Sequence, residues 1–204
     1  SSVAPTEPEQ YMAPDDAPSF YTNIKNGAES FTLEYEDVDK GPYVVNYTRD
    51  KRGIYSVSDN PELKYYYDKK QDVIYKDECG KGKFTLDTVL YNDPTQEIPS
   101  SIFIDKNGTI YKCTDKENSI YISDHGEKIY LTRFDEIGTV YSDLGSIIKD
   151  DNRNAKSHIF IEDQGGLVLM KVKDQENLFY DLDNSKYYYF HDDKCYTGPA
   201  TIKN

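Results

Sequence analysis

The chain has 204 residues, a formal net charge of −13 and a mean hydropathy of −0.80, with 20 tyrosines, 8 phenylalanines and no tryptophan. This acidic balance argues against sequence-independent binding to nucleic acid and against an anionic membrane surface, because both need a concentrated Lys/Arg face. No apolar run reaches the roughly 18 residues of a transmembrane helix, so membrane insertion is not expected.

Residues 1–26 are predicted to be a disordered, acidic and proline-rich leader or linker. Their prolines lie among acidic and small residues, a composition that suits neither a helix nor a sheet. These prolines are Pro5, Pro8, Pro14 and Pro18. Regular structure is expected to begin near Phe31, where "SFTLEYEDV" alternates as a strand does. We therefore expect a single domain over residues 27–204.

A repeat of about nineteen residues runs through this domain. "SIFIDKNGTIYKC" (101–113) is followed by the similar "SIYISDHGEKIYL" (119–131). An aspartate follows each short apolar run at intervals of 18 to 20 residues, namely Asp50, Asp68, Asp87, Asp105, Asp124, Asp143, Asp163 and Asp181. In five of these repeats a glycine comes two or three positions later, where a tight turn requires positive φ: Gly53, Gly108, Gly126, Gly145 and Gly165.

Each repeat predicts one antiparallel β-hairpin. Segments rich in β-branched and aromatic residues flank the aspartates, and polar clusters halfway between them supply a second set of turns. The sequence therefore predicts an all-β domain of tandem hairpin repeats, with about 16 short strands in a meander. The meander forms either a small propeller-like sheet or an extended, solenoid-like sheet. "SIIK" (146–149) is predicted to be a strand, and residues 83–91, which lack a turn glycine, a longer strand.

The predicted strands carry apolar residues on both faces. In "SIFID", Ile102 and Ile104 point to one face and Phe103 to the other. Both faces of the sheet are therefore expected to be covered.

The phrases "FIDKNGTIYK" and "YYYDKKQDVIYK" resemble units of the aromatic hairpin-repeat families, among them the WG-type, YD-type and choline-binding cell-wall repeats. The resemblance covers about residues 45–195 and implies hairpin repetition. It implies no ligand, because the tryptophans that mark the WG-type and choline-binding repeats are absent from this chain.

No metal or cofactor site is expected. Cys79, Cys113 and Cys195 form no CxxC motif, so isolated buried thiols are favoured, while one disulfide with a third thiol stays open. The three histidines share no ligand spacing. "DKNGT" and "DLDNS" contain fragments of a calcium loop, at Asp105 with Asn107 and at Asp181 with Asp183, but turn aspartates are the favoured interpretation.

The function predicted from the sequence is recognition without catalysis. No GxSxG, HExxH, Walker or GxGxxG motif occurs, so we expect a non-enzymatic protein without cofactors. An acidic, tyrosine-rich array suits protein–protein recognition at a cell surface, with a partner that carries a basic patch. A carbohydrate-binding module and a structural spacer are the alternatives, so a glycan is a second candidate partner.

The candidate binding residues are two tyrosine triplets. We expect them at the surface, with burial in the core as the competing interpretation: Tyr65, Tyr66, Tyr67, Tyr187, Tyr188 and Tyr189. Asn46 and Asn107 satisfy the N-glycosylation sequon, although Asn107 also suits an Asn-Gly turn. No signal peptide is recognisable, and a secreted chain from which it has been removed would look the same. We expect an extracellular or cell-surface protein.

Overall fold

The computed structural model describes residues 17–91, 93–151 and 157–199, which form two compact units. The N-terminal unit ends at Cys113 and the C-terminal unit begins at Thr114. Whether residues 27–204 form a single domain stays a prediction. Pro5, Pro8 and Pro14 of the predicted leader lie outside the described residues.

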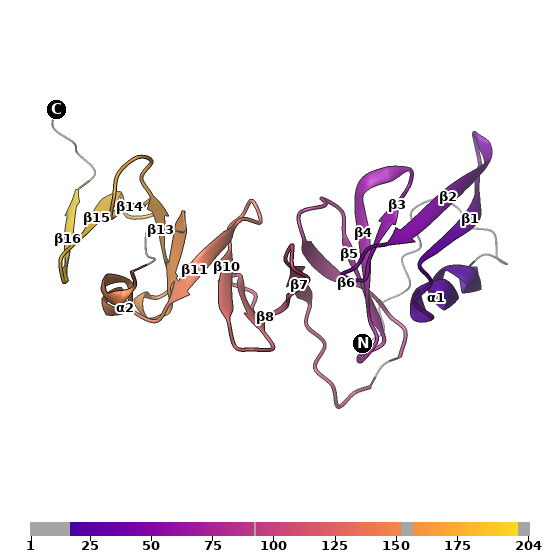
Figure 1. The fold of residues 1–204 in the computed structure, drawn as a ribbon, viewed down its shortest axis with the longest axis horizontal. Coiled ribbons are helices and arrows are strands. Elements are labelled where there is room, and N and C mark those ends of the chain that lie inside the picture. Colours follow the sequence, from indigo (N-terminus) through magenta and orange to yellow (C-terminus); the bar gives the residue numbers. More distant parts are fainter. Residues whose placement is uncertain (1–16, 92, 152–156, 200–204) are drawn as a thin grey trace. The chain divides into compact units, whose positions relative to one another are not determined.

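The N-terminal unit contains one helix and an antiparallel meander whose strand order is the order of the sequence (Figure 1). Its elements are α1 (Ala17–Lys25), β1 (Ser30–Asp37), β2 (Gly41–Arg49), β3 (Ile54–Val57), β4 (Asn60–Asp68), β5 (Val73–Asp77), β6 (Lys83–Val89), β7 (Ser101–Ile104) and β8 (Ile110–Asp115), the last of which extends two residues beyond Cys113.

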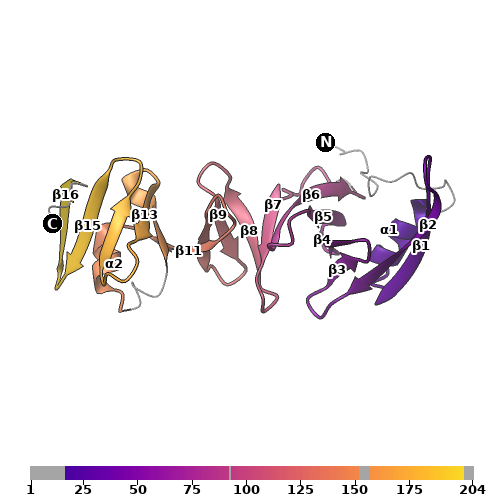
Figure 2. The same cartoon turned by 90° about the horizontal axis from the view of Figure 1, so that it is seen from above.

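The C-terminal unit continues the same pattern with one exception (Figure 2). Its elements are β9 (Ile120–Ser123), β10 (Lys128–Leu131), β11 (Ile137–Tyr141), α2 (Leu144–Lys149), β12 (His158–Ile161), the short 3-10 helix η1 (Glu162–Gln164), β13 (Leu167–Lys171), β14 (Leu178–Asp181), β15 (Lys186–His191) and β16 (Lys194–Pro199). All pairs are antiparallel except β11 with β12, which is parallel.

The all-β meander of sixteen strands is confirmed. Four of the repeat aspartates accept backbone N–H groups in hairpin turns as predicted, namely Asp50, Asp68, Asp105 and Asp181. In the β9–β10 turn the side chain of Ser123, rather than that of Asp124, accepts the backbone N–H of Glu127. The carboxylate of Asp105 accepts the backbone N–H groups of Asn107 and Thr109, both at 2.9 Å, and Gly108 has a φ of +85°. The same arrangement holds at Asp50, which accepts from the backbone of Arg52 and Ile54. Local side-chain bonding of this kind explains why the turns could be found from the sequence.

Two of the eight predicted hairpins do not form. Asp87 lies inside the continuous strand β6, as the absence of a turn glycine indicated. The predicted strand 146–149 is wrong, because these residues belong to α2. Asp143 caps this helix, since its carboxylate accepts the backbone N–H of Ser146 at 2.7 Å. Helix caps and tight turns use the same aspartate chemistry, so the sequence pattern did not distinguish them.

The structure also differs from the predicted leader at α1. This helix lies within residues 1–26, and its Phe20 and Ile24 are buried in the core of the N-terminal unit. Phe20 makes edge-to-face contacts with the rings of Tyr47 and Tyr65. Tertiary burial of these two side chains favours a helix even though the segment follows a proline-rich stretch.

Strands β3 to β7 of the N-terminal sheet bury both of their faces, as the two-faced strands predicted. In β1 and β2 only one face is buried, and the alternate residues, such as Thr32, Glu34 and Val44, are exposed. One face packs against α1 and carries Tyr47, Tyr55, Tyr65 and Ile74, together with residues of β1. The other face is buried over β3 to β7, and its core residues come from β3, β5, β6 and β7: Ile54, Val73, Tyr75, Phe84, Ile102 and Ile104. Ile98, in the connection between β6 and β7, packs against this second face.

The C-terminal sheet buries one face against α2. Its core combines Ile147 of the helix with Ile159, Leu169, Phe179 and Phe190 of four successive strands. These residues alternate with side chains on the opposite face, so that face of β13 to β16 is the one that the helix leaves uncovered.

A comparison of two glycines tests the close approach of β6 to β7. A Cβ at Gly82 would lie 2.8 Å from the carbonyl oxygen of Ile104, and the φ of Gly82 is +95°. Gly41 has a similar φ of +83°, but no atom lies within 4 Å of its Cβ position. Gly41→Ala is expected to lose about 1–2 kcal/mol of unfolding free energy from backbone strain alone. Gly82→Ala adds a backbone clash and is expected to lose roughly 1–3 kcal/mol more, measured by urea denaturation. Equal losses in the two variants would contradict this packing.

The buried tyrosines predict a loss of stability at alkaline pH. Burial, with a smaller contribution from the hydrogen bond to Tyr35, raises the pKa of Tyr47 far above its ordinary value, and burial likewise raises the pKa of Tyr75. The unfolded chain releases these protons near pH 10 while the folded chain keeps them. The tyrosine contribution is therefore complete below pH 10, and above it each group lowers the unfolding free energy by about 1.4 kcal/mol per pH unit.

Urea denaturation between pH 9 and pH 11.5 measures this slope. Tyr75→Phe removes one of these groups and should give a shallower loss of stability above pH 10 than the unaltered chain. Its hydrogen bond to the Pro99 carbonyl is lost at every pH and does not change the slope. An unchanged slope in this variant would refute the assignment.

Candidate functional site

The first tyrosine triplet lies in β4 and belongs largely to the core. Tyr65 is completely buried on the face covered by α1, so the expectation that it is a surface aromatic is corrected. Tyr66 and Tyr67 are half-buried. The structural reason is alternation: β4 is a central strand between two covered faces, so neither side of it is open.

Tyr66 and Tyr67 are held by contacts within the N-terminal unit. The ring of Tyr66 lies over Gly53, 3.5 Å from its Cβ position, and beside the ring of Phe84. The hydroxyl of Tyr67 donates to the carboxylate of Asp72 at 2.6 Å. Burial raises the pKa of both phenols, and for Tyr67 the bond to Asp72 adds to the effect.

The second triplet lies in β15 and is divided between the two faces of the C-terminal sheet. Tyr188 is half-buried and packs against the core beside Cys195. Burial is also the main reason that the pKa of Tyr188 is raised. Tyr187 and Tyr189 point to the opposite face, and 41% of Tyr189 is exposed. Only this part of the two triplets reaches an uncovered sheet surface.

Strand pairing brings further side chains to that surface. Met170 of β13 pairs with Tyr180 of β14, which pairs with Tyr187 of β15. Tyr189 pairs with Tyr196 of β16. We call this set the tyrosine face: Met170, Tyr180, Tyr187, Tyr189 and Tyr196. Met170 and Tyr196 are 40% and 51% exposed.

The tyrosine face consists of two neighbouring ring pairs. The ring centroids of Tyr180 and Tyr187 are 5.0 Å apart, and those of Tyr189 and Tyr196 are 6.5 Å apart. The imidazole of His191 stacks on Tyr189 at 5.8 Å with an interplanar angle of 8°. The exposed side chain of Leu182 lies beside the first pair and helps to line a shallow depression of about 430 Å³ with Met170, Tyr180 and Tyr187.

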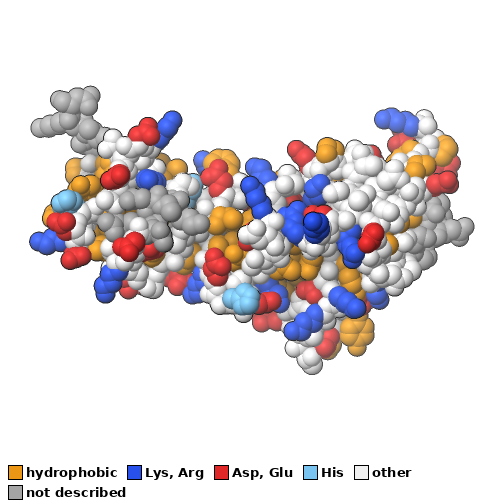
Figure 3. Space-filling view, viewed as in Figure 1, with side chains coloured by type: hydrophobic (Ala, Val, Ile, Leu, Met, Phe, Trp, Pro, Cys, Tyr) orange, Lys and Arg blue, Asp and Glu red, His pale blue; other side chains and the backbone are white. Residues whose placement is uncertain are grey.

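The phenol groups of this face are available for bonding to a ligand. The hydroxyls of Tyr180, Tyr187, Tyr189 and Tyr196 make no hydrogen bond with any residue that the structure describes. Hydrophobic side chains reach the surface of both units among acidic and basic ones (Figure 3). The tyrosine face differs from such scattered residues because pairing across four strands places its members side by side.

Sequence reasoning found Tyr187 and Tyr189 but missed Met170, Tyr180 and Tyr196. The signal that could have found them is the pairing of successive strands, since one register fixes which residues share a face. That register depends on turn length, which the repeat spacing gave only to within one or two residues.

The remaining sequence candidates lie apart from this face. Asn46 in β2 and Asn107 in the β7–β8 turn are both exposed, and the side chain of Asn46 accepts a hydrogen bond from Thr32 at 2.6 Å. No disulfide joins Cys79, Cys113 and Cys195, all of which the structure describes. Asp181 is buried and accepts the backbone N–H groups of Asp183 and Asn184, which is turn bonding. Within the described ranges, no three His, Cys, Asp or Glu side chains gather as metal ligands would, and no helix is long and apolar enough to cross a membrane.

Comparison with known proteins identifies no relative of this chain. No family model, no curated protein and no solved structure matches the chain.

Proposed function

We propose that this chain is a non-enzymatic recognition protein whose tyrosine face binds a protein partner. The observation that carries the proposal is the uncovered face of β13 to β16, where four tyrosines and Met170 lie opposite a face that α2 covers. Tyrosine suits such a surface because it buries a large area at little cost in rotamer entropy and retains a hydroxyl for hydrogen bonding.

The chemistry of the face favours a polypeptide with basic and apolar side chains. Met170 and Leu182 add flexible apolar area, which matches protein side chains better than it matches the hydroxyls of a sugar. The net charge of −13 attracts a basic partner at long range, and Arg or Lys can then lie over the exposed phenol rings.

We also infer an extracellular or cell-surface location. The support is the exposure of Asn46 and Asn107, each within a glycosylation sequon. Loss of mass on endoglycosidase treatment, after secretion from eukaryotic cells, is the expected result, and a chain secreted without glycans would remove this support.

The binding proposal is tested with a displayed peptide library presented to the purified chain. Enriched peptides should be basic and contain apolar or aromatic residues. Tyr189→Ser with Tyr196→Ser should weaken their binding by about 30-fold, because loss of an anchor residue at an interface typically costs about 2 kcal/mol or more. Isothermal titration calorimetry with one enriched peptide measures the change.

Tyr91→Ser is the matched control, because Tyr91 is 65% exposed but lies in the N-terminal unit, away from the tyrosine face. It should leave the affinity unchanged, and the melting temperature of all variants should stay within a few degrees of the parent chain. Equal loss in the control and the double variant would refute the proposal. A glycan array is screened in parallel with the peptide library. If the array detects glycan binding that the double variant abolishes, and no peptide is enriched, the partner is a carbohydrate rather than a protein.

A further inference from the structure

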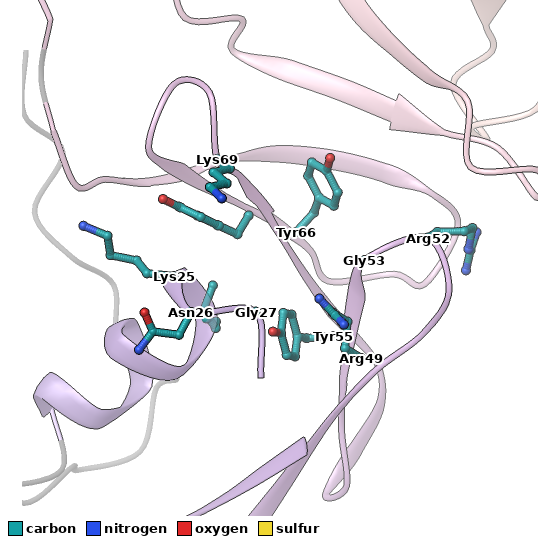
Figure 4. A pocket seen from close by; sticks show the side chains of 11 residues that line it. Lys25, Asn26, Gly27, Arg49, Arg52, Gly53, Tyr55, Tyr66 and Lys69 are labelled. Carbon is teal, nitrogen blue, oxygen red and sulfur yellow. The ribbon is translucent and has the colours of Figure 1, made fainter. Parts of the chain in front are cut away.

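A second surface, in the N-terminal unit, concentrates positive charge in an otherwise acidic chain. A pocket of about 350 Å³ lies where the C-terminal end of α1 meets the β2–β3 turn and the end of β4. Four basic residues line it, Lys25, Arg49, Arg52 and Lys69, and its lining includes no Asp or Glu. Figure 4 shows Lys25, Lys69, Arg49 and Tyr55 around one opening, with Arg52 at its outer side.

Two of the four cations already have partners. Lys25 forms an ion pair with Asp72 at 3.5 Å. Arg52 binds the carboxylate of Asp50 through two of its nitrogens, at 3.0 and 3.2 Å, and donates to the carbonyl oxygen of Asp105. These contacts explain both side chains without a ligand.

The other two cations have no such explanation. The side chains of Arg49 and Lys69 make no hydrogen bond or ion pair with the residues that the structure describes. Arg49 is half-buried, and its guanidinium lies beside Gly27, whose Cβ position is 3.1 Å from an Arg49 nitrogen. Gly27 therefore leaves room for the guanidinium. A partly buried charge without a partner is costly, and an anion in the pocket would compensate it.

Asn26 and three tyrosines, Tyr55, Tyr66 and Tyr67, form the rest of the polar lining. The hydroxyl of Tyr55 donates to the carbonyl of Ala28, which fixes the ring in the lining of the pocket. The hydroxyl of Tyr66 makes no hydrogen bond within the described part of the chain, so it can donate to a ligand. Rings and cations together suit a molecule that carries both an anionic group and an organic ring.

We infer that this pocket binds the phosphate or sulfate group of a small organic molecule. Arg49 supplies two parallel N–H donors and Lys69 a point charge to the oxyanion, while Tyr55 and Tyr66 contact the organic part. The volume of about 350 Å³ lies at the small end of ligand sites, which limits the ligand to about the size of a sugar phosphate or a mononucleotide.

Isothermal titration calorimetry with the full chain tests the site. The probes are glucose 6-phosphate, glucose 6-sulfate, adenosine 5′-monophosphate, inorganic phosphate and glucose, at low ionic strength. At least one organic anion should bind with a dissociation constant below about 1 mM, and glucose should not bind. The order of the phosphate and sulfate esters identifies which oxyanion the pocket prefers. Lack of binding by every organic anion, or equal affinity for inorganic phosphate, would overturn the proposal.

Neutral variants locate the binding. Arg49→Met should weaken it by about tenfold or more, the effect of losing a hydrogen bond to a charged group. Lys69→Met changes an exposed turn residue, so it serves as the test if Arg49→Met does not fold. Lys40→Met is the control, since Lys40 lies in the β1–β2 turn and does not line the pocket. Equal weakening by Lys40→Met would show that only general charge attraction is measured and would refute the site.

Discussion

Alternating burial along single strands is the constraint on which both units depend. In β4, Tyr65 and Tyr66 point to opposite faces, and both of those faces are covered in the N-terminal unit. In β15, Tyr188 and Tyr189 also point to opposite faces, but α2 covers only one of them. The same three-tyrosine phrase is therefore covered on both sides in one unit, whereas in the other unit Tyr188 faces the core and Tyr187 and Tyr189 face the uncovered side. What lies against the sheet, rather than the strand sequence, determines the difference.

The hydroxyls of four buried tyrosines have hydrogen-bond partners in the interior. Tyr35 and Tyr47 hydrogen-bond to each other, Tyr55 donates to Ala28, and Tyr75 donates to Pro99. The connections before β1 and before β7 therefore supply acceptors as well as links between elements. A phenylalanine core would need none of these loop positions, so the tyrosine-rich composition couples the sheet to its connections.

The strands could be predicted because their signals are local, whereas the sites could not. Asp105 and Gly108 form a turn through local bonds that do not depend on distant parts of the chain. The spacing of such turns along the sequence therefore predicted most of the strands. At Asp143 the same side chain caps a helix instead, and the choice depends on the burial of Ile147 against distant strands. The tyrosine face needs a register across four strands, and the basic pocket brings together residues as far apart as Lys25 and Lys69. Neither the tyrosine face nor the basic pocket can be recognised from the sequence of a single nineteen-residue repeat.

The parallel pairing of β11 with β12 preserves the direction of the repeat. In a hairpin over residues 137–149, a second strand would lead the chain back to the end of the sheet where β11 begins. Here the helix α2 leads it back instead. Because β12 has the same direction as β11, strands β12 to β16 have the directions that they would have in an uninterrupted array of hairpins. The turns after β9, β12 and β14 consequently lie at the same end of this sheet as the cap of α2, so Asp124, Asp143, Asp163 and Asp181 all lie at that end. A helix can thus replace a strand in such an array without reversing anything downstream of it.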